Sequence, residues 1–122
     1  METFSVAIAV TYIQQMYALP ELTLAAVSAY CGVHPNYLSR CFKAETGQCF
    51  VNYRAEVRMC KAASLAISGE LMYIAAEKSG FSDPYYFGRC YKRYFGINYS
   101  EFSKLCQSSK INQNSLSSIL PL

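Results

Sequence analysis

Apolar residues recur at spacings of three and four along most of the chain, and no stretch shows the strict alternation of a β-strand. Residues 5–17 set one apolar stripe, made of Val6, Ala9, Val10, Ile13, Met16 and Tyr17. The same spacing predicts further helices at about 24–30, 35–45, 49–67, 72–79, 84–95 and 100–106. Helix breakers stand between them, namely Pro20, Gly32, Gly47, Gly69, Gly80 and Gly96. The sequence therefore predicts an all-α fold of seven helices.

The most informative feature is an internal repeat. Residues 35–47 read PNYLSRCFKAETG, and residues 84–96 read PYYFGRCYKRYFG, so the proline, tyrosine, Arg-Cys pair, lysine and final glycine coincide. Each copy follows a short helix that ends in glycine, which is the helix-turn-helix pattern. Scaffolds built from helix pairs usually stack their copies directly, whereas a long helix separates these two. We expect a first unit at about 5–47, a linker helix at about 49–67 and a second unit at about 71–106.

In a helix-turn-helix, the second helix of each unit enters the major groove of DNA. Helical spacing assigns to the outward face of the first copy Asn36, Ser39, Arg40 and Lys43, and to that of the second Tyr85, Gly88, Arg89, Lys92 and, beside them, Arg93. The predicted core faces are Tyr37, Leu38, Cys41 and Phe42 in the first copy and Tyr86, Phe87, Cys90 and Tyr91 in the second. Arginine can bind guanine bidentately and asparagine can bind adenine, whereas lysine more often meets phosphate.

Composition and the placement of charge favour a nucleic-acid-binding protein over an enzyme. The 122 residues are 52% hydrophobic and carry 11 basic against 8 acidic side chains, which alone is a weak argument for nucleic acid. Five of the basic residues, however, fall on the two repeated stretches, with no acidic residue between the proline and the lysine of either copy. We find no acid–base pair, no nucleophile spaced to pair with a histidine and no phosphate loop, so an enzyme is not expected.

The six cysteines do not suggest a metal site or any cofactor. They form no C-x-x-C pair, and His34 is the only histidine of the chain. Because they fall within apolar helical patterns, we expect buried, reduced thiols and hence a cytoplasmic protein. The N-terminal apolar run lacks a basic segment before it and is too short for a signal peptide or a membrane span.

The second copy, GFSDPYYFGRCYKRYFG at 80–96, closely resembles the signature of the AraC/XylS family of bacterial transcription regulators, and GVHPNYLSRCFKAETG at 32–47 is similar to the family's first unit. The resemblance covers about residues 5–106 and implies a seven-helix DNA-binding domain at 1–106. The tail at 107–122 is rich in serine and asparagine, and we expect it to be flexible. It implies that a single chain recognises an asymmetric promoter site, usually as an activator. It places base contacts on Asn36, Ser39, Arg40, Tyr85, Gly88 and Arg89. It places phosphate contacts on Thr23, Lys43 and Lys92, with His34 and Arg93 as further candidates.

The chain also departs from the family pattern. His34 stands where a serine is common, and a neutral imidazole is a poorer helix cap. Leu71 replaces a serine or threonine, which weakens the phosphate contact expected there. Gly88 has no side chain, so the second unit could read fewer bases than usual. Tyr99 and Ser103 replace the familiar proline and arginine near the last helix.

Two questions stay open at this stage. A linker of about 19 residues spans roughly 28 Å, near the ~34 Å between successive major grooves on one face of DNA, which favours a DNA-binding domain. The alternative is a protein-interaction module with the same fold and weak or lost DNA binding. The first helix is apolar nearly all round, because Phe4, Ile8 and Tyr12 lie off its stripe. It either binds a partner, such as RNA polymerase or an N-terminal sensing or dimerisation domain, or packs Phe4 and Tyr12 onto its own core.

Overall fold

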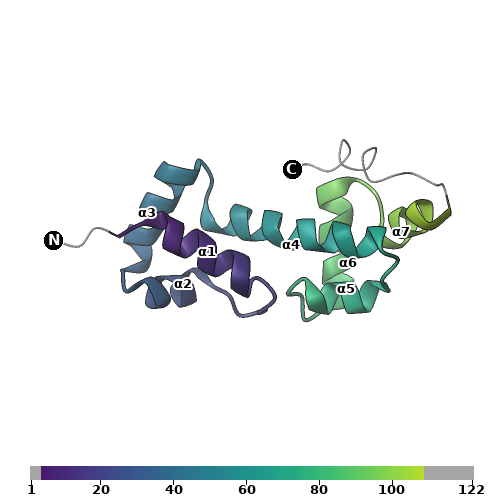
Figure 1. Ribbon diagram of the computed structural model, residues 1–122, viewed down its shortest axis with the longest axis horizontal. Helices are drawn as coiled ribbons and strands as arrows, with labels where there is room; N and C mark the ends of the chain where they lie inside the picture. Colours follow the sequence, from purple (N-terminus) through teal and green to yellow (C-terminus); the bar gives the residue numbers. More distant parts are fainter. Residues whose placement is uncertain (1–3, 109–122) are drawn as a thin grey trace. The chain divides into compact units, whose positions relative to one another are not determined.

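The computed structural model describes residues 4–108 and contains seven helices and no strand within them (Figure 1). The helices are α1 Val6–Met16, α2 Leu24–Cys31, α3 Pro35–Thr46, α4 Phe50–Ile67, α5 Met72–Lys78, α6 Pro84–Phe95 and α7 Tyr99–Ser108. The predicted all-α fold class is confirmed. Two compact units meet at the Val57–Arg58 bond inside α4. Most of the predicted tail, 107–122, lies outside the described residues, and its first two residues belong to α7.

The first unit packs α1, α2, α3 and the start of α4 around one core. Its buried residues are Val6, Ala9, Ile13, Leu22, Val27, Leu38, Phe42 and Phe50. The predicted stripe of α1 thus faces the core, with Val10 and Met16 half-buried at its edge. Phe4 and Tyr12 also pack against this core, and Tyr12 stacks on Tyr30 at 3.9 Å between ring centroids.

The second unit packs α5, α6, α7 and the C-terminal part of α4 around a separate core. Its buried residues are Met59, Ala62, Leu65, Ala66, Ala75, Ala76, Phe87, Tyr91, Tyr99 and Phe102. Aromatic rings dominate it, because Phe87, Tyr91 and Tyr99 meet one another at centroid distances of 5.3–6.0 Å. The Tyr99 hydroxyl donates to the Glu70 carbonyl at 2.7 Å, which ties the start of α7 to the loop before α5.

Helix α4 contributes to both cores in turn. Phe50, Tyr53 and Val57, which recur at helical spacing, pack in the first core. Beyond them, Cys60, Ala63 and Ile67 also recur at helical spacing in the sequence, but this spacing describes the second core only in part. The residues that line the second core most deeply are Met59, Ala62, Leu65 and Ala66, whereas Cys60 and Ile67 are half-buried. A single helical spacing predicts one buried face, whereas α4 buries different faces in the two cores, so the spacing could not predict all of its core residues.

None of the six cysteines forms a disulfide. Five are half-buried, and burial raises the pKa of Cys31 and Cys106 above the ordinary value. The prediction of buried thiols is therefore wrong, because these five are only half-buried and Cys49 is exposed on the turn before α4, which begins only at Phe50. Within residues 4–108 there is no cluster of His, Cys, Asp or Glu that could hold a metal ion. No helix in the same range is long and apolar enough to cross a membrane.

Candidate nucleic-acid interface

Helices α2 and α3 form the first helix-turn-helix. The Thr23 hydroxyl accepts a hydrogen bond from the Ala26 amide at 3.1 Å and caps α2. Gly32 ends that helix at a φ of 73°, in the left-handed region that only glycine adopts readily. The next helix begins at Pro35, whose missing N–H costs nothing in a first turn. The sequence therefore determines both ends of this turn.

The outward face of α3 carries all of its predicted contact residues. Asn36, Ser39, Arg40 and Lys43 are exposed, and Leu38 and Phe42 on the opposite face are completely buried. Tyr37 corrects the predicted core face, because it is 40% exposed. It lies at the edge of the buried stripe, where a tyrosine can cover apolar surface with its ring and keep its hydroxyl in water. A side-chain hydrogen bond with Cys41 raises the pKa of Tyr37.

Helices α5 and α6 repeat this arrangement in the second unit. Asp83 caps α6 by accepting a hydrogen bond from the Tyr85 amide at 3.0 Å, and Phe87 and Tyr91 fill the core. The candidate contact residues Tyr85, Arg89, Lys92 and Arg93 are exposed, and Gly88 is half-buried. Tyr86, predicted to face the core, is 48% exposed, for the same geometric reason as its counterpart in α3.

The two misassigned tyrosines turn out to support the two predicted base-contacting arginines. The Arg40 guanidinium carbon lies 5.9 Å from the centroid of the Tyr37 ring, and that of Arg89 lies 5.6 Å from the Tyr86 ring. Both distances fall within the range of cation–π attraction. Because each arginine follows its tyrosine by three residues, tyrosine and arginine share one face of their helix.

A second aromatic ring backs each tyrosine. Phe4 lies 6.2 Å from Tyr37 between ring centroids, and Phe81 lies 6.1 Å from Tyr86. The two phenylalanines do not correspond in the repeat, since one precedes α1 and the other precedes α6. Both units therefore have the same arrangement of phenylalanine, tyrosine and arginine, although their phenylalanines come from positions that are not equivalent in the repeat.

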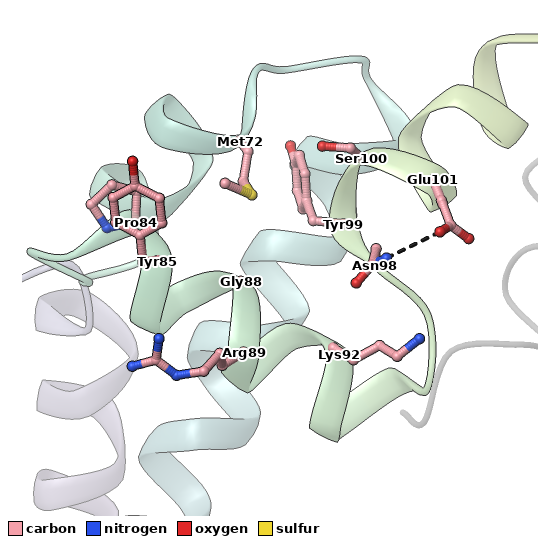
Figure 2. Close-up of a pocket in the computed structure, with 10 residues that line it drawn as sticks. All are labelled: Met72, Pro84, Tyr85, Gly88, Arg89, Lys92, Asn98, Tyr99, Ser100 and Glu101. Carbon is pink, nitrogen blue, oxygen red and sulfur yellow. Dashed lines mark hydrogen bonds between the residues drawn. The ribbon is translucent and has the colours of Figure 1, made fainter.

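A groove of about 500 Å³ lies along the outward face of α6 (Figure 2). Its lining residues are Met72, Pro84, Tyr85, Gly88, Arg89, Lys92, Asn98, Tyr99, Ser100 and Glu101. The part over Gly88 is apolar, whereas the part beside α7 is polar and includes a hydrogen bond from Asn98 to Glu101 at 3.0 Å. Sequence reasoning missed Met72, Asn98 and Ser100. Their position at the starts of α5 and α7 was a usable signal, because helix N-termini attract anions.

The helix-turn-helix domain family matches residues 27–104, which include both repeated helices. The C-terminal domain of AraT, a response regulator from Geobacillus stearothermophilus, is 32% identical and superposes with a TM-score of 0.81 over 92% of this chain and 96% of that one.

The chain belongs to the AraC-type helix-turn-helix family.

Members of this AraC-type family are DNA-binding transcription regulators, which are not an enzyme class. The C-terminal domain of the response regulator yesN from Fusobacterium nucleatum is also 32% identical, with a TM-score of 0.77 over 80% of this chain and 95% of that one. Among curated proteins, an uncharacterised HTH-type transcriptional regulator of Escherichia coli, YpdC, is 34% identical over 75% of this chain. The match spans only 32% of the length of YpdC.

Three of the residues that depart from the AraC-type pattern lie at the starts of helices. His34 caps α3, because its Nδ1 accepts a hydrogen bond from the Asn36 amide at 3.1 Å, so the ring proton lies on Nε2. Leu71 precedes α5 without any side-chain cap and is 58% exposed. Tyr99 opens α7 as a core residue with only 2% exposure.

The predicted phosphate contacts are all exposed, but three of them, Thr23, His34 and Lys43, already have hydrogen bonds within the protein. The Lys43 ammonium donates to the Gly47 carbonyl at 3.3 Å and so also serves the C-terminus of α3. The Thr23 hydroxyl accepts the capping bond and can still donate its own hydrogen. Lys92 and Arg93 lie in the last turn of α6, and Lys92 lines the groove.

Proposed function

We propose that this chain recognises specific sequences in double-stranded promoter DNA by inserting α3 and α6 into successive major grooves. The observation that carries the proposal is the pair of exposed arginines, Arg40 and Arg89, at the same position of two repeated helices, each held by a neighbouring tyrosine. Arginine in a major groove binds the O6 and N7 atoms of guanine with two hydrogen bonds. Each unit would then recognise at least one guanine.

The other base contacts follow from the exposed neighbours of these arginines. Asn36 and Ser39 accompany Arg40 on the outward face of α3, and asparagine can pair bidentately with adenine. Tyr85, 77% exposed, accompanies Arg89 on α6 and offers a ring for apolar contact with a base edge.

Phosphate contacts would fix the register of the two helices. Lys92 and Arg93 extend the basic face of α6, and Lys43 does so for α3. The Thr23 hydroxyl lies at the start of α2, where the helix N-terminus also favours an anion. For His34, the Nε2–H left over from capping is a suitable donor to phosphate.

Two further partners belong to this proposal. An activator must contact RNA polymerase, and we propose this role because the resemblance to the AraC/XylS family implies activation. The curated relatives are about three times as long as the matched segment or longer, which supports a sensing or dimerisation domain working with this one. Phe4 and Tyr12 pack on the first core. Of the predicted partner surface on α1, only Ile8 therefore remains, with 49% of its surface exposed.

Binding isotherms on a duplex selected from random sequence test the proposal. Arg40→Ala and Arg89→Ala should each weaken specific binding by about 1–3 kcal/mol and relax preference at one base position. Affinity should fall steeply with salt, because bound lysines and arginines release counterions from DNA. If no duplex binds with salt-dependent affinity, the alternative of a protein-interaction module replaces this proposal. If duplexes bind but both variants match the parent, the assignment of the recognition helices is wrong.

A further inference from the structure

Gly88 differs from every other glycine of the chain. Five of the six glycines have positive φ angles between 73° and 96° and are therefore required by the backbone, namely Gly32, Gly47, Gly69, Gly80 and Gly96. Gly88 lies in the middle of α6, outside that conformation, where glycine destabilises a helix relative to alanine. The backbone gives no reason for a glycine at this position.

Packing within the protein gives no reason either. A Cβ atom built on Gly88 would meet only the Met72 sulfur, at 3.6 Å, which is an ordinary van der Waals contact. The second unit could therefore hold an alanine here without moving, and it would gain helix stability. A residue that weakens its own helix without serving the fold is expected where a ligand needs the space.

The space that Gly88 leaves open faces the groove along α6, between Tyr85 and Arg89 (Figure 2). The nearest wall of this space is the Met72 sulfur, while the Tyr85 ring lines the same groove beside Pro84 and the Tyr99 hydroxyl is already bonded to Glu70. The atom nearest to this space is a thioether sulfur, which is a weak hydrogen-bond partner for a polar base edge. The one apolar group that base pairs present in the major groove is the 5-methyl group of thymine.

We propose that Gly88 is the floor of a recess that receives the 5-methyl group of a thymine, so that the second unit recognises this base by shape. The proposal rests on the proposed function, since it assumes that α6 lies in a major groove. The positive charges of Arg89 and Lys92 at the rim suit the approach of DNA to this recess. The absence of a side chain at Gly88 then adds to sequence recognition.

The test combines stability without DNA and binding with altered DNA. Gly88→Ala should raise the melting temperature by about 3–6 °C, because alanine is the better helix former. In the parent chain, replacing thymine by deoxyuridine at one position of the selected duplex should weaken binding ~4-fold, the value for one buried methyl group. Gly88→Ala should bind the thymine duplex at least ~4-fold more weakly and no longer distinguish thymine from deoxyuridine there.

Ala44→Gly, at an exposed position of α3, is the matched control for stability. It should lower the melting temperature by a similar amount and leave the thymine preference intact. A lower melting temperature for Gly88→Ala would show that the fold needs this glycine and would overturn the proposal. So would a parent chain that binds its duplex selectively yet responds to deoxyuridine at no position. Failure of the parent to select any duplex would instead refute the proposed function itself.

Discussion

The tyrosine beside each arginine should increase the affinity for a specific DNA sequence without changing the free energy of unfolding. Replacing Tyr86 by leucine removes the ring that lies 5.6 Å from the Arg89 guanidinium but keeps an apolar side chain at this 48% exposed position. An exposed cation–π contact is worth about 0.5–1 kcal/mol, so Tyr86→Leu should weaken specific binding ~2- to 5-fold. Tyr86→Phe retains the ring and should stay within ~2-fold of the parent, because the ring and not the hydroxyl meets the arginine.

A double-mutant cycle measured by fluorescence anisotropy separates this effect from a contact between Tyr86 and DNA. In an Arg89→Ala background, Tyr86→Leu should cause no further loss, because no guanidinium remains to be positioned. Tyr37 and Arg40, at 5.9 Å, form the matched pair in α3 and should behave alike. An equal loss from Tyr86→Leu in both backgrounds, or a loss with phenylalanine as large as with leucine, would refute the reasoning.

Four further predictions follow from single residues. Lys92→Ala should weaken binding to all sequences alike and lower the salt slope by about one; a loss confined to one sequence would mean that Lys92 contacts bases. Burial, with Glu70 nearby, raises the pKa of Tyr99 from 10.0 to about 12, so the free energy of unfolding should hold below pH 10 and fall between pH 10 and 12. In alkaline denaturation Tyr99→Phe should flatten that fall and exposed Tyr73→Phe should not; equal curves for the two would contradict the assignment. Exposed Cys49 should react with a thiol reagent well before the five half-buried cysteines, and uniform rates would argue against this packing. Ile8→Glu should leave DNA affinity and melting temperature unchanged but lower transcription from a target promoter, and unchanged transcription would remove the partner surface on α1.

The helices could be predicted because periodicity and terminators agreed along most of the chain. Gly32 and Gly96 end their helices at positive φ, as the sequence indicated. The predicted end of α1, at residue 17, lies one residue beyond Met16, where the helix ends with Tyr17 as its C-cap, well before Pro20. The residue before a proline avoids helical angles, and a turn closed by the Leu19 amide on the Met16 carbonyl takes over earlier.

The interface was predicted less completely than the fold. The outward residues of α3 and α6 lie where the repeat placed them, but Tyr37 and Tyr86 do not face the core. Helical spacing predicts the centre of a buried stripe better than its width. In α3 the fully buried stripe consists only of Leu38 and Phe42, so Tyr37 falls outside it. The groove along α6 was not predictable, since it forms where α7 and the start of α5 meet that helix in space.

Enrichment of random duplexes by the whole chain, followed by sequencing, tests most directly whether both helices recognise bases. We expect one asymmetric motif with two blocks of preferred bases, each containing a guanine. Arg40→Ala should remove the guanine preference from one block only, and Arg89→Ala from the other only. Enrichment of a single block, or of none, would contradict recognition by two helices.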